Sequence, residues 1–217
     1  MNILLVNPKT PPTFHSFKYA LKFIRKTISP PLGLLTVSSM LPESWNRKLV
    51  DLNIENLSTS DIRWADYVFL TGMDIQIDYF REILSRCKQE GARVVAGGPM
   101  VTFEHESFPE VDHFILNEAE ITLPRFLDDL ANGKPRRVYS TDQFPDIYET
   151  PVPDWSLLDT KKYYMMNVQY SRACPYDCEF CSVKAFLGRK YRWKPLDNVL
   201  AEVADLKKRL AEINLPD

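Results

Sequence analysis

The sequence predicts an α/β fold that is built around a parallel β-sheet. Short apolar runs alternate with segments in which apolar residues recur at helical spacing through the first two-thirds of the chain, and this alternation implies a parallel sheet with right-handed crossovers. The chain has 217 residues, a hydrophobic content of 45% and a formal net charge of -2. It can therefore bury a domain core, and it has no general attraction to nucleic acid or anionic membranes. Because MNILLVNP lacks the features of a signal peptide and no run is long enough to span a bilayer, we expect a cytoplasmic protein.

Five apolar runs are the predicted strands of this sheet. The first, Asn2–Val6, ends at Asn7-Pro8, as a buried parallel strand does. The other four are Lys48–Leu52, Tyr67–Leu70, Arg93–Ala96 and His113–Leu116. We therefore expect a five-stranded parallel sheet within residues 1–140.

Three helices are predicted between or after these strands. One begins at Pro30-Pro31, since proline is favoured in the first turn of a helix. A second covers residues 80–87, where apolar residues recur at helical spacing, and Gly91 ends it. A third covers residues 123–130 and ends at Asn132-Gly133.

Small residues, amides and carboxylates gather where the predicted strands end, which is where parallel sheets bind ligands. The glycines of this set are also what tight turns require, and its acidic residues are also what helix N-termini favour. No GxGxxG follows the first strand, so the usual dinucleotide fingerprint is missing. The candidate ligand contacts are Thr71, Gly72, Gly97, Gly98, Asn117, Glu118 and Glu120.

The composition changes after residue 140. Three prolines fall within TDQFPDIYETPVPDWSLLD, which predicts an extended linker over residues 141–163 that wraps the first domain. A further strand candidate, Met165–Tyr170, leads into a cluster of cysteines, and a helix is predicted over Leu196–Ile213. Residues 164–217 are therefore expected to begin a second domain.

Three of the four cysteines lie within eight residues, as Cys174, Cys178 and Cys181 in a CxxxCxxC pattern. Soft thiolates select zinc, copper(I) or iron–sulfur clusters. A structural zinc site needs four ligands, usually as two pairs, and the sequence has no second pair. Three cysteines on one loop suit a [4Fe–4S] cluster with one iron left open, while zinc and free thiols remain the alternatives. Cys87, on the core face of a predicted helix, is expected to be a buried structural thiol.

The cysteine spacing, with Phe180 directly before Cys181, resembles the CxxxCxΦC signature of radical S-adenosylmethionine enzymes. The resemblance implies that the open iron chelates S-adenosylmethionine and that Phe180 lies at the adenine. Nearly the whole chain is similar to the cobalamin-binding-domain radical S-adenosylmethionine enzymes, most of all to the group that contains the hopanoid C-2 methylase. The stretches that carry this similarity include PPLGLLTVSSMLP, WADYVFLTGMDIQ, RCKQEGARVVAGGP, VDHFILNEAEITLPRFLDDL and YSRACPYDCEFCSV.

This family resemblance implies a fold, cofactors and an activity. The sheet would be a Rossmann-like, flavodoxin-like domain that binds cobalamin, and residues 164–217 would begin a (β/α) barrel that binds the cluster and S-adenosylmethionine. The complete enzyme would transfer a methyl group to an unactivated carbon of a lipid or other metabolite, with flavodoxin or ferredoxin as electron donor. No residue is assigned as a catalytic group. The alternative is a non-catalytic cofactor-binding fragment, because only one βα unit follows the linker and a six-unit barrel needs on the order of 180 residues.

Three further features bear on this interpretation. No DxHxxG follows the first strand, so we expect no histidine on cobalt; His15, in the corresponding loop, is interpreted as a surface or packing residue. Ala173 stands where the group has glycine, a change between small residues that we expect to be harmless. The segment Ser182–Lys194 holds five basic residues and no acid, which predicts a solvated face or a docking surface for an acidic reductase.

Overall fold

The computed structural model describes residues 1–11 and 27–211, and its main sheet has six parallel strands in the order β2-β1-β3-β4-β5-β6. The first five positions follow the order of flavodoxin-like sheets, in which ligands bind at the point where the strand order reverses. This confirms the predicted fold class and adds a short edge strand, β6, to the five expected strands. The strands are β1 Asn2–Asn7, β2 Asn46–Asp51, β3 Tyr67–Thr71, β4 Arg93–Gly97, β5 His113–Ile115 and β6 Val138–Tyr139.

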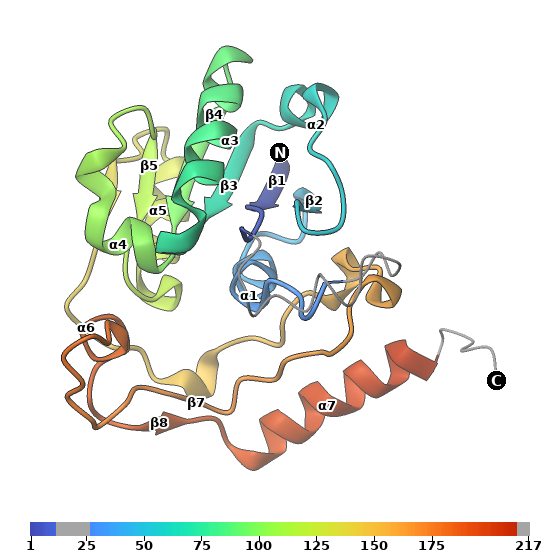
Figure 1. The fold of residues 1–217 in the computed structure, drawn as a ribbon, viewed down its shortest axis with the longest axis vertical. Coiled ribbons are helices and arrows are strands. Elements are labelled where there is room, and N and C mark those ends of the chain that lie inside the picture. Colours follow the sequence, from blue (N-terminus) through green and yellow to red (C-terminus); the bar gives the residue numbers. More distant parts are fainter. Residues whose placement is uncertain (12–26, 212–217) are drawn as a thin grey trace.

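Helices cover both faces of the sheet (Figure 1). Residues along each strand point alternately to the two faces, so Leu4 and Val6 of β1 join one core cluster while Ile3 and Leu5 join the other. The first cluster is completed by α2 (Thr59–Trp64), α3 (Ile77–Gln89) and α4 (Pro99–Glu104), and the second by α1 (Leu32–Ser39) and α5 (Ala119–Ala131).

The helix ends follow local sequence signals. Ser58 and Asp61 form a capping box at the start of α2, because each side chain accepts a hydrogen bond from the other residue's backbone N–H. Gly91 and Gly133 follow α3 and α5 with φ of 72° and 70°, the left-handed conformation that stops a helix. The predicted stops at these two glycines are confirmed.

Residues 141–163 carry three single-turn 3₁₀ helices, Ile147–Glu149, Trp155–Leu157 and Thr160–Lys162, and residues 152–154 contact α1. Trp155 is buried in the core cluster of α1 and α5. The Asp154 N–H donates to the carbonyl of Leu35 at 3.0 Å, and the Ser38 hydroxyl donates to the Asp154 carboxylate at 2.9 Å. These bonds hold the segment on the face of the sheet that α1 covers.

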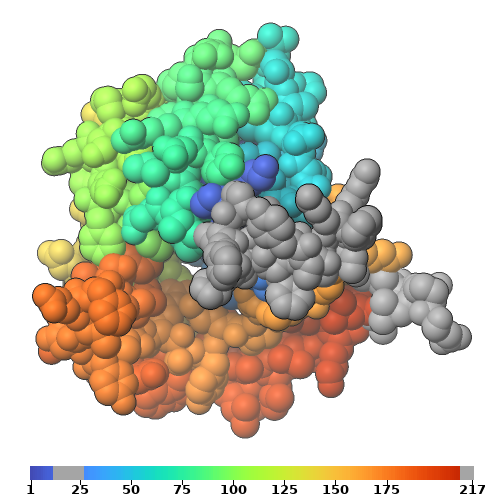
Figure 2. Space-filling model, in the orientation of Figure 1, coloured from blue at the N-terminus to red at the C-terminus, as the bar shows by residue number. Residues whose placement is uncertain are grey.

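The rest of the described chain lies beneath the carboxyl ends of the strands (Figure 1). Figure 2 shows it as an orange and red layer below the sheet domain. It forms a two-stranded antiparallel sheet of β7 (Ser171–Arg172) and β8 (Arg192–Trp193), with α6 (Val183–Leu187) between them and α7 (Leu196–Ala211) after them. The predicted strand over Met165–Tyr170 is wrong: within the described residues no strand pairs with it, and an unpaired strand has little stability in water. No helix of the described chain is long and apolar enough to cross a membrane.

Candidate cofactor site

A cavity of about 310 Å³ lies over the central strands, between α1 and the start of α5. Phe69, Val95 and Ile115 of the three central strands form its apolar floor, with Leu123 of α5 beside them. Its volume falls at the lower end of the range for small-molecule sites, and an apolar lining with a few polar groups is typical of such sites. The cavity therefore has the size and character of a pocket for part of a cofactor.

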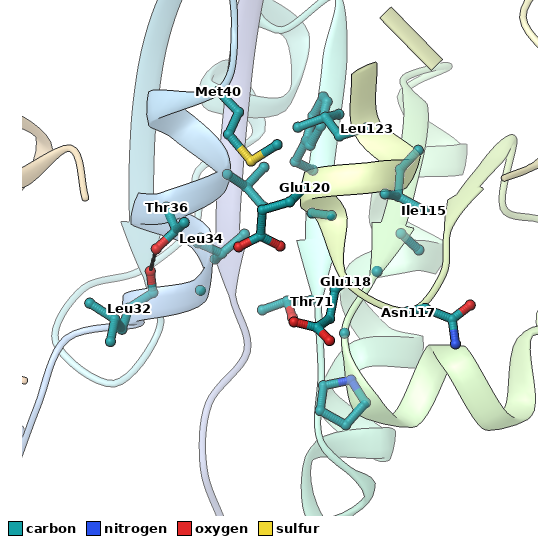
Figure 3. A pocket seen from close by; sticks show the side chains of 18 of the residues that line it. Leu32, Leu34, Thr36, Met40, Thr71, Ile115, Asn117, Glu118, Glu120 and Leu123 are labelled. Atoms are coloured by element: carbon teal, nitrogen blue, oxygen red, sulfur yellow. Dashed lines mark hydrogen bonds between the residues drawn. The ribbon is translucent and has the colours of Figure 1, made fainter. Parts of the chain in front are cut away.

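One face of α1 forms a wall of this cavity. Gly33, Thr36, Val37 and Met40 line it at the i, i+3, i+4 and i+7 positions of a helical stripe. Met40 is directed into the space between α1 and α5 (Figure 3). A Cβ added to Gly33 would meet no protein atom within 4 Å, so glycine leaves room at this point. Sequence reasoning missed this wall, because Gly33 in the run PPLGLL has no turn or strand end to mark it.

The glycines after β3 and β4 have separate structural reasons. A Cβ on Gly97 would lie 2.8 Å from the carbonyl oxygen of Ile115, and Gly98 has φ of 102°, where side chains are strained. Both glycines and Thr71 line the cavity. Gly72 does not belong to its lining, and a Cβ there would lie 3.1 Å from Phe80 and Met100 in the opposite core. Three of these four predicted contacts therefore stand at the cavity.

The residues of NEAE also line the cavity. Glu118 is the N-cap residue of α5, but its side chain makes no capping hydrogen bond, and Glu120 lies in the first turn of the helix. Asn117 has a left-handed φ of 62°, which asparagine tolerates better than most residues, and its backbone N–H donates to the Thr102 hydroxyl at 3.0 Å. Figure 3 shows Glu120 directed into the space between α1 and α5, with Glu118 beside Thr71. The capping interpretation of Glu118 is wrong, since that carboxylate forms ion pairs instead.

Two arginines from the second half of the chain bind these carboxylates. Arg172 donates from its two terminal nitrogens to Glu118 at 2.5 Å and to Glu120 at 2.7 Å. Arg192 binds both oxygens of Glu118, at 2.7 and 3.0 Å. Burial acts to raise the pKa of Glu120, but the hydrogen bond and charge of Arg172 outweigh burial and hold that pKa below its usual value. Sequence reasoning missed both arginines, because they lie 54 and 74 residues from Glu118.

The cysteine loop lies next to the cavity. Phe186 and Leu187 of α6, within the segment that joins β7 to β8, line the cavity beside Arg172. All three loop cysteines are free: Cys174 and Cys181 are half-buried, and Cys178 is exposed. Among residues 1–11 and 27–211, no three Cys, His, Asp or Glu side chains are gathered closely enough to hold a metal ion. Three thiols on one loop are nevertheless a set of ligands that suits soft metals and iron–sulfur clusters.

The remaining predicted site residues have mixed outcomes. Phe180 is 93% exposed on the same loop, and His15 lies outside the described residues. Cys87 is fully buried, as predicted, and burial raises the pKa of its thiol to about 11. Ala173 has φ of 84°, so the expectation that alanine is harmless there is wrong: a Cβ in this region costs conformational energy that glycine avoids.

The basic segment Ser182–Lys194 is not simply a solvated face. Lys184 and Arg189 both pair with Asp177, and Arg192 pairs with buried Glu118. Lys194 is 4% exposed and donates to the Glu202 carboxylate at 2.9 Å. Four of the five basic residues of the segment are therefore paired with carboxylates of the protein.

The comparisons with known proteins agree with this geometry. Residues 24–127 match the B12 binding domain. The chain contains a B12-binding domain. The matched residues include β3, β4, β5, α1 and the start of α5, which form most of the cavity lining, while Arg172, Phe186 and Leu187 from the second half of the chain complete it.

Several methyltransferases are similar to nearly the whole chain. An uncharacterized methyltransferase of Synechocystis is 39% identical over 206 residues, which are 94% of this chain and 38% of the relative. The hopanoid C-2 methylase of Rhodopseudomonas palustris is 30% identical over 93% of this chain and 39% of its own length. The bacteriochlorophyllide d C-8(2)-methyltransferase of Chlorobaculum tepidum is 26% identical over 84% of this chain and 42% of its own length. The chain thus spans about two-fifths of the length of these relatives.

Proposed function

We propose that this chain is the cobalamin-binding and cluster-binding part of a radical S-adenosylmethionine enzyme that transfers methyl groups. One observation carries the proposal: the cavity of the B12-binding domain adjoins the loop that holds CxxxCxxC, with Phe186 and Leu187 lining the cavity from that loop. The names of the similar methyltransferases support methyl transfer. A small molecule or a lipid is the proposed acceptor, and flavodoxin or ferredoxin is the proposed electron donor.

The residues of the cavity have distinct roles in this proposal. Cobalamin is larger than the cavity, so we propose that its nucleotide tail enters while the corrin ring stays outside. Phe69, Val95 and Ile115 would exclude water from the tail, and Gly33 would let it approach the backbone of α1. When bound, cobalamin would carry the methyl group, and a cluster would supply the electron that cleaves S-adenosylmethionine. Cys174, Cys178 and Cys181 would bind the iron, and Phe180 would pack against the adenine.

Anaerobic reconstitution of the chain with iron and sulfide tests the cluster. We expect close to four irons per chain, as three cysteines that hold a [4Fe–4S] cluster require. Cys178→Ala should abolish the brown chromophore and its EPR signal. Cys87→Ala is the matched control, because the buried Cys87 thiol is protonated and should not bind iron. Stoichiometric zinc with no uptake of iron would overturn the cluster proposal.

A binding role without catalysis is the second candidate function. Phe180 and Cys178 are exposed, and the three loop thiols are not gathered into one site. Both observations favour a binding role for the part of the chain that the structure describes. The two candidates differ in one product, since only an enzyme forms 5′-deoxyadenosine from S-adenosylmethionine under reducing conditions.

A further inference from the structure

Both ends of the cysteine loop are fixed to one carboxylate. The loop runs from residue 173 to residue 191, between β7 and β8. Arg172 and Arg192 stand opposite each other in the register of these two strands. Both bind Glu118, which follows β5 of the B12-binding domain. A single residue of the sheet domain therefore closes the base of the loop.

The contacts of Glu118 are buried and complete. Its side chain is 3% exposed, and those of Arg172 and Arg192 are 9% and 13% exposed. One carboxylate oxygen accepts from both arginines and the other accepts from Arg192. Arg192 also donates to the carbonyl of Leu187 at 2.8 Å, which ties α6 to the same group. Loss of one partner would leave an uncompensated buried charge, which is strongly unfavourable.

Two of these three side chains also form part of the cavity wall, and Arg192 does not. Glu118, Glu120 and Arg172 line the cavity together with Leu187 of the loop. A ligand in the cavity therefore contacts the group that holds the loop closed. Movement of Glu118 or Arg172 would therefore alter both the cavity wall and the base of the loop.

We propose that Glu118, Arg172 and Arg192 form a latch that couples cobalamin binding in the cavity to cluster assembly on the cysteine loop. This inference rests on the proposed function. A ligand that packs against the latch would further restrict the opening of its ion pairs, so the thiols would lose less conformational freedom when they gather around iron. Coupling of this kind is reciprocal, so a cluster on the loop would tighten cobalamin binding by the same factor.

Titration of the full chain with cyanocobalamin, before and after anaerobic iron–sulfur reconstitution, measures this coupling. We expect the dissociation constant to fall by at least about fivefold on reconstitution, the lower end of typical coupling. Glu118→Gln keeps the shape of the side chain but removes its charge, and should reduce this ratio to below about twofold. Arg63→Gln is the control, because it breaks an exposed ion pair with Glu90 on another part of the domain and should leave the ratio unchanged.

Alkylation of the iron-free protein supplies a second measurement. Cyanocobalamin should slow the reaction of iodoacetamide with the half-buried Cys174 at least about fivefold in the wild type, by the same coupling. In Arg192→Lys, cyanocobalamin should leave the rate of this reaction unchanged. Lysine keeps the charge but cannot bind both oxygens of Glu118 in the bidentate manner of arginine. Cys87 is fully buried, so its alkylation marks any variant that has lost its fold.

The outcomes separate the latch from the proposed function. If the wild type binds no cobalamin or no iron, the proposed function fails and the latch fails with it. If both cofactors bind but the wild-type ratio is one, the latch alone is wrong. An unchanged ratio in Glu118→Gln, with Cys87 still protected, would also overturn the latch.

Discussion

Replacing Gly33 by leucine should fill the cavity of the B12-binding domain and weaken cobalamin binding. Gly33 lies on the stripe of α1 that lines the cavity, and an added Cβ would meet no protein atom within 4 Å. Truncation of one buried leucine can open a cavity of about 150 Å³. The reverse change at Gly33 would therefore occupy on the order of half of the 310 Å³ cavity.

The expected loss of affinity follows from the cost of overpacking. Extra side-chain volume in a filled site costs about 1–3 kcal/mol, and every 1.4 kcal/mol changes a dissociation constant about tenfold. Gly33→Leu should therefore raise the dissociation constant for cyanocobalamin roughly five- to hundredfold in an absorbance or fluorescence titration. The protein should keep its fold, because the leucine would enter open space rather than a packed core.

Gly33→Ala is the matched control. The alanine adds only a Cβ to a helix, where it is more favourable than glycine by up to about 1 kcal/mol. This variant should unfold at a slightly higher temperature than the wild type and bind cyanocobalamin within about threefold of it. A Gly33→Leu protein that is folded and binds as tightly as the wild type would refute the placement of cobalamin between α1 and α5.

Three other predictions concern the loop, the linker and catalysis. Ala173→Gly should raise the free energy of unfolding by about 1 kcal/mol, measured by denaturant titration, since glycine adopts the φ of 84° without strain; a loss of stability would contradict this. Burial acts to raise the pKa of Asp154, but hydrogen bonds from Ser156 and Ser38 and the charge of Arg47 lower it below its usual 3.8. Asp154→Asn should therefore cost about 1 kcal/mol at pH 7, and the difference should shrink as the pH falls below about 4, whereas a pH-independent difference would exclude the ionised carboxylate as its cause. The 217-residue chain should form little 5′-deoxyadenosine with dithionite under anaerobic conditions, because Phe180 is 93% exposed and productive cleavage needs a closed site; repeated turnover would contradict this.

The sequence predicted the sheet well because its signals are local. Each of the five predicted strands is a strand in the structure, and each of its ends differs from the predicted end by at most two residues. The stops at Gly91 and Gly133 need only the left-handed backbone that glycine allows. The strand expected over Met165–Tyr170 failed for a non-local reason, since a run of strand-forming residues needs a neighbouring strand to pair with.

The site was predicted less completely, because much of it depends on distant contacts. Residues at strand ends could be found from the topology alone, and most of them line the cavity. Gly33 faces the cavity from a helix whose position on the sheet no local pattern reveals. The arginine partners of Glu118 required knowledge that β7 and β8 fold back beneath the sheet. Charges so far apart in sequence cannot be paired before the fold is known.

We propose that cobalamin binds in the cavity between α1 and α5, beside the cysteine loop. Crystals of the chain grown with cyanocobalamin test it most directly, because the anomalous scattering of cobalt locates the metal without reference to any assumed pose. We expect one cobalt peak at the mouth of the cavity, between the end of β4 and α6, with density for the nucleotide tail running inward past Gly33. A cobalt peak on any other face of the protein, with the cavity filled by solvent, would contradict it.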